Sequence, residues 1–266
     1  MSKAELIAVA KDRLEHYRAG TMALGDDVFR VPASDYFDED RFRLEVERIF
    51  HRLPLLLAPS AELPNPGDYK AMTVCGTPVL LVRDTAGELR GYYNSCSHRG
   101  TWLTAEGTGN VSRLACPYHG WTYDLQGNLT AIVSEGNFGD IDKSQYGLVS
   151  LPVTERAGLI WCTLNPDSNV DFDAFLSGYD DLLANFGFES WHLFESRTLR
   201  GPNWKIAYDG YLDFYHVPVL HRTTFPNIPS NKGNYYAWGP HQRLVFPDVG
   251  LDEAAAMITR PSFRKE

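Results

Sequence analysis

Two short segments of the chain each place a cysteine and a histidine within four residues of one another. The first is Cys96–His98 (Cys-Ser-His) and the second is Cys116–His119 (Cys-Pro-Tyr-His), with seventeen residues between them. Each segment offers one thiolate and one imidazole, which zinc and iron both accept as ligands. The spacing therefore predicts a metal centre with four ligands, namely Cys96, His98, Cys116 and His119.

The order of these ligands separates two kinds of metal centre. Zinc fingers place a cysteine pair before a histidine pair, whereas here each segment mixes the two residue types. A [2Fe–2S] centre, in which two cysteines hold one iron and two histidines hold the other, accounts for the mixing. Neutral imidazoles in place of thiolates remove negative charge and raise the reduction potential. We therefore favour the iron–sulfur centre, with zinc as the alternative.

Residues beside the two segments fit a role in housing this centre. Gly100 and Gly120 would let the backbone turn closely around a cluster, and Trp121 would shield it from water. The two remaining cysteines, Cys75 and Cys162, lie in or beside apolar strand patterns. We expect both to be buried structural residues.

A second group of metal-ligating residue types lies further along the chain. Asp209, Asp213 and His216 are spaced i, i+4 and i+7, which predicts one shared helical face. His221 follows Pro218, so the chain can bend back and bring a second imidazole beside the first. Two histidines and a carboxylate on one face of an iron leave open positions for oxygen and substrate. Histidine pairs more often belong to a core, but a cluster that stores an electron needs an acceptor.

At these residues the sequence resembles the Rieske non-haem iron oxygenases, specifically the large (alpha) oxygenase subunit of the aromatic-ring-hydroxylating type. The Rieske part is C-x-H followed by C-x2-H, and the iron part is D-x-x-H-x4-H. The respiratory Rieske branch has an additional disulfide, and its two positions hold Thr101 and Tyr118 here. The resemblance extends from about residue 30 to residue 246.

The resemblance implies how two metal sites would work together. His216 and His221 would bind a mononuclear non-haem Fe(II). Asp213 would hydrogen-bond His216 and reach His119 of the partner subunit without being a ligand, which implies a ring-shaped homotrimer. Electrons from NADH or NADPH would arrive through a reductase, with or without a ferredoxin. Oxygen from O2 would enter an aromatic or other small organic substrate by hydroxylation, dihydroxylation or demethylation.

The chain departs from the family pattern at two dipeptides. Where the family often has Glu-Asn before the iron motif, this chain has Tyr208-Asp209. Where the family often has Thr-Trp, it has Leu53-Pro54. Asp209 keeps an oxygen acceptor near the expected iron and adds a negative charge. We therefore include Asp209 with Asp213 among the candidate catalytic residues.

The third iron ligand of the family is a carboxylate far downstream of the second histidine. This chain continues for 45 residues after His221. Asp248, Asp252 and Glu253 come too early to match, and we expect them to be solvated surface acids. The C-terminal part of the catalytic domain is therefore expected to be missing. A Rieske-type electron-transfer protein with an incomplete iron site is the alternative function, and a zinc-stabilised binding protein is the third.

Hydrophobic periodicity predicts the elements that position these residues. The predicted helices are 6–17, ended by Gly20, then 40–51, 172–186 and 204–215, the last stopped near Pro218. The predicted strands are 69–74, 78–83, 89–93, 122–124, 129–132, 151–155, 159–163 and 243–246. Short strands and tight turns from about residue 65 to 165 indicate a small antiparallel sandwich or barrel.

These elements predict the α+β fold class, with an all-β Rieske [2Fe-2S] domain, N-terminal helices and an incomplete α+β (helix-grip-like) catalytic domain. The expected domains are a helical segment at 1–52, which packs on the catalytic domain, the Rieske domain at 53–165 and the partial catalytic domain with the iron motif at 166–266.

Composition limits the class of protein further. The chain is 44% hydrophobic and 22% charged, as in ordinary globular proteins. Its net charge of −9 disfavours binding to nucleic-acid phosphates. The apolar stretches are far shorter than the ~18 residues of a membrane helix, and the charged N-terminus does not resemble a signal peptide. We therefore expect a cytoplasmic protein that binds neither nucleic acid nor membrane.

Overall fold

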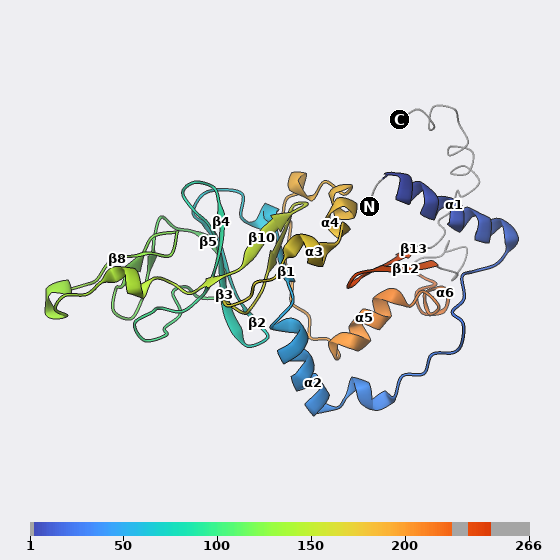
Figure 1. Cartoon of the computed structure of the whole chain (residues 1–266), viewed down its shortest axis with the longest axis horizontal. Coiled ribbons are helices and arrows are strands. Elements are labelled where there is room, and N and C mark those ends of the chain that lie inside the picture. The colour runs from blue at the N-terminus through green and yellow to red at the C-terminus, as the bar shows by residue number, and fades with distance from the viewer. Residues whose placement is uncertain (1–2, 225–233, 246–266) are drawn as a thin grey trace. The chain divides into compact units, whose positions relative to one another are not determined.

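The computed structural model describes residues 3–224 and 234–245, which form two compact units (Figure 1). The larger unit consists of Glu39–Phe175 and Asp180–Ser196. The smaller unit consists of Met1–Asp38, Leu176–Tyr179 and Arg197–Glu266. The two predicted metal centres fall in different units, because the cysteine and histidine segments belong to the larger unit and the iron motif belongs to the smaller one.

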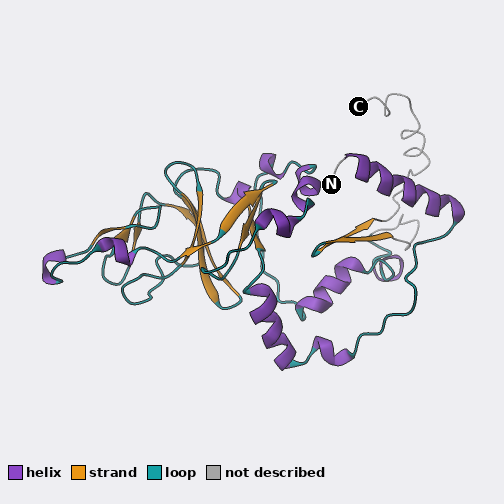
Figure 2. Ribbon diagram, in the orientation of Figure 1, coloured by secondary structure: helices purple, strands orange, loops and turns teal. Residues whose placement is uncertain are grey.

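The larger unit is built on antiparallel strands, shown in orange in Figure 2. Its main sheet has the order β5-β2-β3-β4-β9. These strands are β5 (Gly107–Asn110), β2 (Asp68–Val74), β3 (Thr77–Arg83), β4 (Leu89–Tyr93) and β9 (Ser150–Leu151). Tight turns join β2 to β3 and β3 to β4, with Tyr69 paired to Val82 and Val79 paired to Tyr93. The predicted central strands are confirmed.

Two three-stranded sheets complete the β structure of the larger unit. One has the order β1-β11-β10, with β1 (Leu55–Pro59), β11 (Leu159–Cys162) and β10 (Val153–Arg156). The other has the order β6-β7-β8, with β6 (Leu114–Ala115), β7 (Thr122–Tyr123) and β8 (Leu129–Ala131). All pairings are antiparallel, so the described chain has the predicted all-β Rieske part within an α+β fold.

Strand β3 divides the larger unit into two hydrophobic cores because its residues are buried on both faces. Leu80 and Val82 pack in one core, together with Cys96 and Cys116. Val79 and Leu81 alternate with them and pack in the other core, with Ile160 and Cys162 among its members. The first core therefore contains the cysteines of both predicted ligand segments.

The expectations for the two remaining cysteines have opposite outcomes. Cys162 is fully buried, and burial raises the pKa of its thiol to about 12. Cys75 is exposed, so the expectation that it is buried is wrong. It occupies the turn between β2 and β3, where its left-handed φ of 48° and the following Gly76 reverse the chain.

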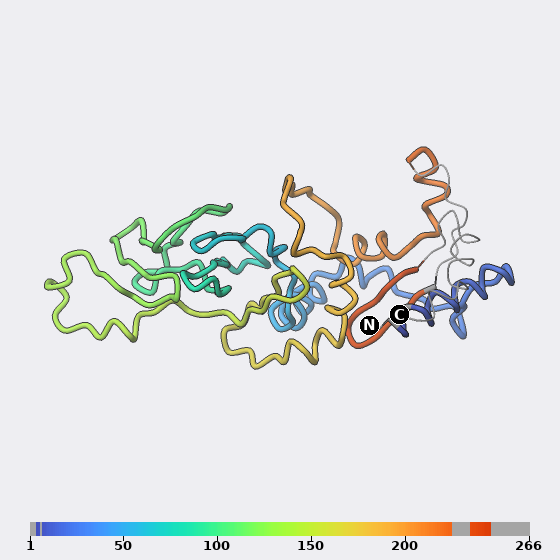
Figure 3. Tube along the Cα trace, turned by 90° about the horizontal axis from the view of Figure 1, so that it is seen from above, coloured from blue at the N-terminus to red at the C-terminus, as the bar shows by residue number. Residues whose placement is uncertain are grey.

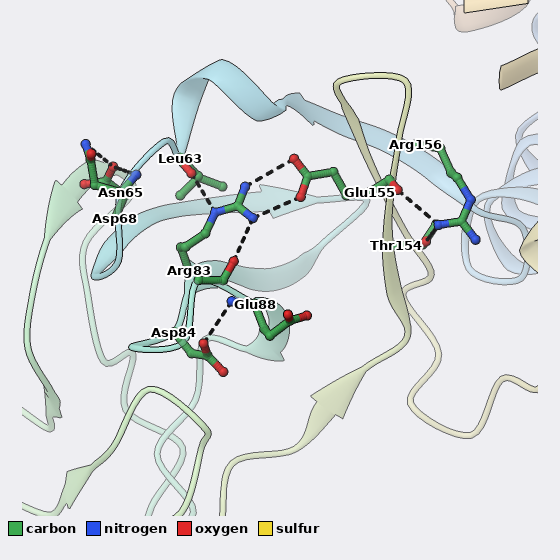
Figure 4. A network of polar contacts seen from close by, with 10 residues as sticks. Leu63, Asn65, Asp68, Arg83, Asp84, Glu88, Thr154, Glu155 and Arg156 are labelled. Carbon is green, nitrogen blue, oxygen red and sulfur yellow. Dashed lines mark hydrogen bonds and ion pairs between the residues drawn. The ribbon is translucent and has the colours of Figure 1, made fainter. Parts of the chain in front are cut away.

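Arg83 at the end of β3 joins two sheets of the larger unit (Figure 4). Its guanidinium donates to the carbonyl oxygens of Leu63 (2.8 Å) and Gly87 (3.1 Å) and binds both carboxylate oxygens of Glu155 on β10 (3.0 and 3.2 Å). Burial alone would raise the pKa of Glu155, but the hydrogen bonds and the charge of Arg83 lower it. The paired carboxylate is therefore ionised in the folded protein at neutral pH.

The helical segments of the larger unit correct one sequence expectation. Helix α2 (Glu39–Glu45) continues as a π-helical turn (Val46–Phe50), which confirms the helix predicted near 40–51. The single helix predicted over 172–186 is wrong, because α3 (Phe172–Leu176) and α4 (Tyr179–Ala184) are separate. Ser177 and Gly178 between them have φ values of 50° and 79°, and this left-handed pair breaks the helix.

The smaller unit contains α1 (Lys3–Ala19), α5 (Trp204–Leu212), α6 (Val217–Leu220) and the hairpin β12 (Asn234–Trp238) and β13 (His241–Val245), which Figure 3 traces in red. Helix α1 ends before Gly20 (φ 66°), as predicted. Helix α5 ends at Leu212, three residues earlier than predicted. Pro218 lies in the first turn of α6, where proline is tolerated because no helical N–H bond is required there.

Short 3-10 turns connect the longer elements. They are η1 (Ala33–Tyr36), η3 (Ser60–Glu62), η4 (Glu135–Asn137), η5 (Lys143–Tyr146) and η6 (Phe188–Ser190). Strand β13 matches the strand predicted at 243–246, although Phe246 lies outside the described residues. Within the described ranges, no helix combines the length and the apolar composition that crossing a bilayer requires.

Candidate metal centres

The two cysteine and histidine segments form loops with the same backbone hydrogen bonding. In the first loop, Cys96 N–H donates to Thr101 O (2.9 Å) and Gly100 N–H donates to Cys96 O (2.8 Å). In the second, Cys116 N–H donates to the carbonyl of Trp121 (2.8 Å), and its own carbonyl accepts from Gly120 N–H (3.0 Å). The glycines have φ values of 73° and 69°, so the tight turns expected of them are present.

The loops bring the four predicted ligands together in pairs. The thiols of Cys96 and Cys116 are free and nearly fully buried, with 3% and 4% of each residue exposed. Burial raises the pKa of Cys96, and the adjacent Cys116 thiol raises it further. Hydrogen bonds from Tyr123 and from the His98 backbone act in the opposite direction, but the pKa remains raised. The rings of His98 and His119 lie 4.8 Å apart between centroids. One pair of thiols and one pair of imidazoles therefore converge.

The donor atoms of this site fit a metal that binds through histidine nitrogen. His98 Nδ1 is buried and has no hydrogen-bond partner, a costly state for a polar atom unless another group binds it. Burial lowers the pKa of His98, and the nearby His119 and Arg99 lower it further. The neutral ring is the form that ligates metal. The indole of Trp121 stacks on His98 with a centroid distance of 4.8 Å and an interplanar angle of 9°.

Tyr123 is a site residue that the sequence interpretation did not identify. Its hydroxyl accepts the Ser97 N–H (3.1 Å) and lies 3.2 Å from the sulfur of Cys96. The side chain is fully buried, and burial, followed by the Cys96 contact, raises its pKa. Tyr123 therefore remains protonated, and its O–H is directed to a sulfur that ligates metal only as a thiolate. The sequence signal was its place in the predicted strand 122–124, directly after the second ligand segment.

The pairwise arrangement argues against a single zinc ion. Zinc would need all four ligands in one tetrahedral shell. A centre with two irons needs only two protein ligands on each metal, so the paired loops suit it better.

In the smaller unit, His216 and His221 also lie together, with ring centroids 5.3 Å apart. Asp213 Oδ2 is 3.1 Å from His216 Nδ1, and Asp213 Oδ1 accepts the Tyr215 N–H (2.7 Å). The expectation that Asp213 and His216 share a helical face is wrong, because α5 ends at Leu212 and Asp213 has extended backbone angles (φ −86°, ψ 105°). Instead, the hydrogen bond from Tyr215 N–H to the Asp213 side chain forms an Asx turn, and this turn brings Asp213 against His216.

Asp209 stands on α5 and has a partner from a distant part of the sequence. Its Oδ2 accepts a hydrogen bond of 2.6 Å from the hydroxyl of Tyr36, which lies in η1. This hydrogen bond is the largest cause of the raised pKa of Tyr36, followed by burial and by the charges of Asp209 and Asp35. No hydrogen bond joins Asp209 to His216 in the described residues, and the carbonyl of Asp209 accepts the Asp213 N–H (2.7 Å). Tyr36 thus anchors the helix that precedes the histidine pair.

A carboxylate that could serve as the third iron ligand beside the two histidines is not found in the part of the chain that the structure describes. Asp248, Asp252 and Glu253, which we expected to be surface acids, lie outside the described residues.

Comparisons with known proteins agree with both halves of this description. Residues 54–144 match the model of the Rieske [2Fe-2S] domain, and residues 188–265 match the ring hydroxylating alpha subunit (catalytic domain). The chain is 32% identical over 216 residues to the glycine betaine monooxygenase oxygenase subunit of Pseudomonas aeruginosa, covering 79% of this chain and 49% of that protein. It is 29% identical over 204 residues to the anthranilate 1,2-dioxygenase large subunit of Acinetobacter baylyi, covering 74% and 43%.

Two solved structures have a similar fold. A quaternary ammonium Rieske monooxygenase in complex with L-carnitine gives a TM-score of 0.74 with 27% identity, covering 80% of this chain and 61% of that one. Naphthalene 1,2-dioxygenase from a Rhodococcus species gives a TM-score of 0.67 with 27% identity, covering 85% and 51%. The chain spans about half the length of the curated relatives that it matches.

The two matched domains imply an iron–sulfur cluster and a non-haem iron, which are the two groups that the paired loops and the histidine pair suit. On the joint strength of its residues, fold and relatives, this chain belongs to the alpha subunits of the Rieske non-haem iron oxygenases.

Proposed function

We propose that Cys96 and Cys116 hold one iron of a [2Fe–2S] cluster and that His98 and His119 hold the other. The observation that carries this assignment is the buried, unpartnered Nδ1 of His98 in a loop that repeats the hydrogen bonding of its counterpart. The free, buried thiols support it, because thiolates need a cation to offset their burial. Trp121 covers one face of His98 and excludes water there.

His216 and His221 hold a mononuclear Fe(II) in this proposal, with Asp213 as a positioning residue. When both groups are bound, the cluster supplies single electrons and the iron activates O2 for insertion into an organic substrate. Asp213 Oδ2 accepts the Nδ1 proton of His216, which fixes the tautomer and leaves Nε2 as the ligand atom. Asp209 supports the same segment through Tyr36 and α5.

The proposed assembly follows the family in its electron path. Asp213 bridges His216 to His119 of the partner subunit, which requires a ring-shaped homotrimer. The relatives are named as oxygenase subunits, which implies a separate reductase component in those systems. We propose the same arrangement here, with NADH or NADPH as the electron source and a ferredoxin as an optional intermediate. The proposed domain bounds remain 1–52, 53–165 and 166–266.

The names of the relatives include two reaction types and several substrates. Glycine betaine and carnitine are quaternary ammonium compounds, anthranilate is an aromatic acid, and naphthalene is an aromatic hydrocarbon. The first three carry a carboxylate. We propose a small organic substrate that is hydroxylated, dihydroxylated or demethylated.

A second candidate is an electron carrier that uses the cluster alone. It is favoured by the observation that no carboxylate completes a three-ligand site with His216 and His221 in the described residues. Iron and acid-labile sulfide analysis of the purified chain distinguishes the two functions. Three irons and two sulfides per chain, with O2-dependent oxidation of the third iron, support the oxygenase. Two irons and two sulfides support the carrier, and zinc without sulfide contradicts both.

A further inference from the structure

A depression of about 670 Å³ opens beside His216 in the smaller unit. This volume lies within the range of small-molecule sites. The lining residues are Tyr215, His216, Val219, Leu220, Arg222 and Thr223. They supply a guanidinium, two hydroxyls, an imidazole and two aliphatic side chains, and none of them carries a negative charge. The lining is therefore suited to a ligand with an anionic group and an apolar body.

Arg222 is the source of positive charge in this depression, and its charge is not neutralised within the described residues. It has no hydrogen bond or ion pair to any residue in 3–224 or 234–245. The acids of the preceding segment are already engaged, since Asp213 contacts His216 and Asp209 contacts Tyr36. A guanidinium offers a planar fork of donors that matches a carboxylate in two parallel hydrogen bonds. Its open donors are thus available to a ligand.

Helix α6 fixes the positions of the apolar and charged residues that line the depression. His216 is the N-cap residue of helix α6, and the N–H groups of Val219 and Leu220 donate to the carbonyl of His216 at 3.1 and 2.8 Å. Val219 and Leu220 are 74% and 69% exposed, so their side chains remain available for contact. Arg222 follows His221 at the end of this helix. An acid bound to Arg222 would therefore lay its apolar body along α6, beside His216.

We propose that Arg222 binds the carboxylate of a small organic acid and so selects acids over their neutral counterparts as substrates. This inference deepens the proposed function and rests on it, because it takes His216 as a ligand of the reacting iron. Arg222 fixes one end of the substrate while the remainder lies against Val219 and Leu220. In this proposal Arg222 binds the substrate and takes no part in proton or electron transfer.

The test measures equilibrium binding under nitrogen at constant ionic strength, without turnover. The probes are benzoate and trimethylacetate, each compared with its uncharged amide, on the purified metal-loaded chain by titration calorimetry. At least one acid should bind about tenfold more tightly than its amide. Arg222→Gln should reduce this preference to less than about twofold, and Arg222→Lys should retain part of it, because a point charge replaces the fork.

Arg200→Gln is the matched control, because Arg200 is an exposed arginine of the same unit that does not line the depression. It should keep the wild-type preference. An absence of preference in the wild type, including no binding of any probe, overturns the proposal. So does a preference that survives Arg222→Gln or is lost in Arg200→Gln. If acid preference persists while metal analysis finds no third iron, the iron assignment alone fails.

Discussion

The hydroxyl of Tyr123 contacts the sulfur of Cys96 and can therefore influence the reduction potential of the proposed cluster. The Ser97 N–H occupies an acceptor site of the tyrosine oxygen, so the phenolic hydrogen is free to donate to the cysteine sulfur 3.2 Å away. Hydrogen bonds to ligating sulfurs are one of the means by which proteins set cluster potentials. The bond strengthens as negative charge on the sulfur increases, so it favours the reduced state.

Tyr123→Phe should therefore lower the reduction potential of the cluster. A tenfold weakening of the preference for the reduced state corresponds to ~59 mV in a one-electron couple, and we expect a fall of that order. A redox titration followed by visible absorption measures it. Tyr92→Phe is the control, because Tyr92 is buried in the same core and its hydroxyl bonds Leu125 O instead. An unchanged potential in Tyr123→Phe, or an equal fall in both variants, would contradict the assigned hydrogen bond.

At the scale of elements, the turn after α5 places Asp213 against His216. Asp213→Asn should leave both metal contents unchanged, because the residue is not a ligand, but should slow electron transfer between the sites by about tenfold or more. Stopped-flow reoxidation of the reduced cluster measures this rate. Asp26→Asn makes the same change of charge elsewhere in the smaller unit and should behave as wild type. A wild-type reoxidation rate in Asp213→Asn would contradict the proposal that Asp213 bridges the two metal sites.

The turn between β10 and β11 tests packing within the larger unit. Gly158 has a φ of 70°, and a Cβ there would meet Glu189 N at 2.6 Å and Phe188 C at 2.8 Å. Gly158→Ala should therefore lower the free energy of unfolding by more than left-handed strain alone, by about 1–3 kcal/mol beyond it. Gly76→Ala is the matched control, since Gly76 has a φ of 80° with nothing within 4 Å. Urea denaturation measures the free energy of unfolding of both variants. Equal losses in the two variants would show that the close approach of a Cβ at residue 158 to Phe188 and Glu189 costs nothing.

The same elements show which features local sequence can predict. The central strands and the ligand loops were predictable because each depends on residues within a few positions, as in the continuous apolar run Val79–Val82. The break at Ser177 was not, because a left-handed serine has no periodic signature. The contact between Tyr36 and Asp209 joins residues 173 apart in sequence and was also beyond local patterns. The site was thus predictable in its ligands and not in their hydrogen-bonding partners.

At the scale of the whole molecule, carboxylates that are hydrogen-bonded in the fold should make its stability decrease at acid pH. Burial alone would raise the pKa of Asp84, but hydrogen bonds from Glu88 N–H, Arg90 and Ala86 N–H lower it, and the pKa of Glu155 is lowered similarly. Each group therefore stabilises the fold above its unfolded pKa, about 3.9 for Asp and 4.3 for Glu, and this stability is lost as pH falls through the folded value.

The urea midpoint should accordingly fall as pH decreases below about 4. Asp84→Asn should be less stable than wild type at pH 7, and its midpoint should change less between pH 5 and pH 3, since the variant carboxamide does not titrate in that range. Parallel pH profiles for wild type and Asp84→Asn would contradict the lowered pKa in the fold.

The central claim is that two cysteines and two histidines from paired loops hold one iron–sulfur cluster. The most direct measurement is the visible spectrum and acid-labile sulfide content of His98→Ala beside Cys162→Ala, both purified without air. His98→Ala should lose the cluster absorption and the sulfide, whereas Cys162→Ala should keep both, because Cys162 lies in the other core. A wild-type spectrum and sulfide content in His98→Ala would contradict the ligand assignment and the account built on it.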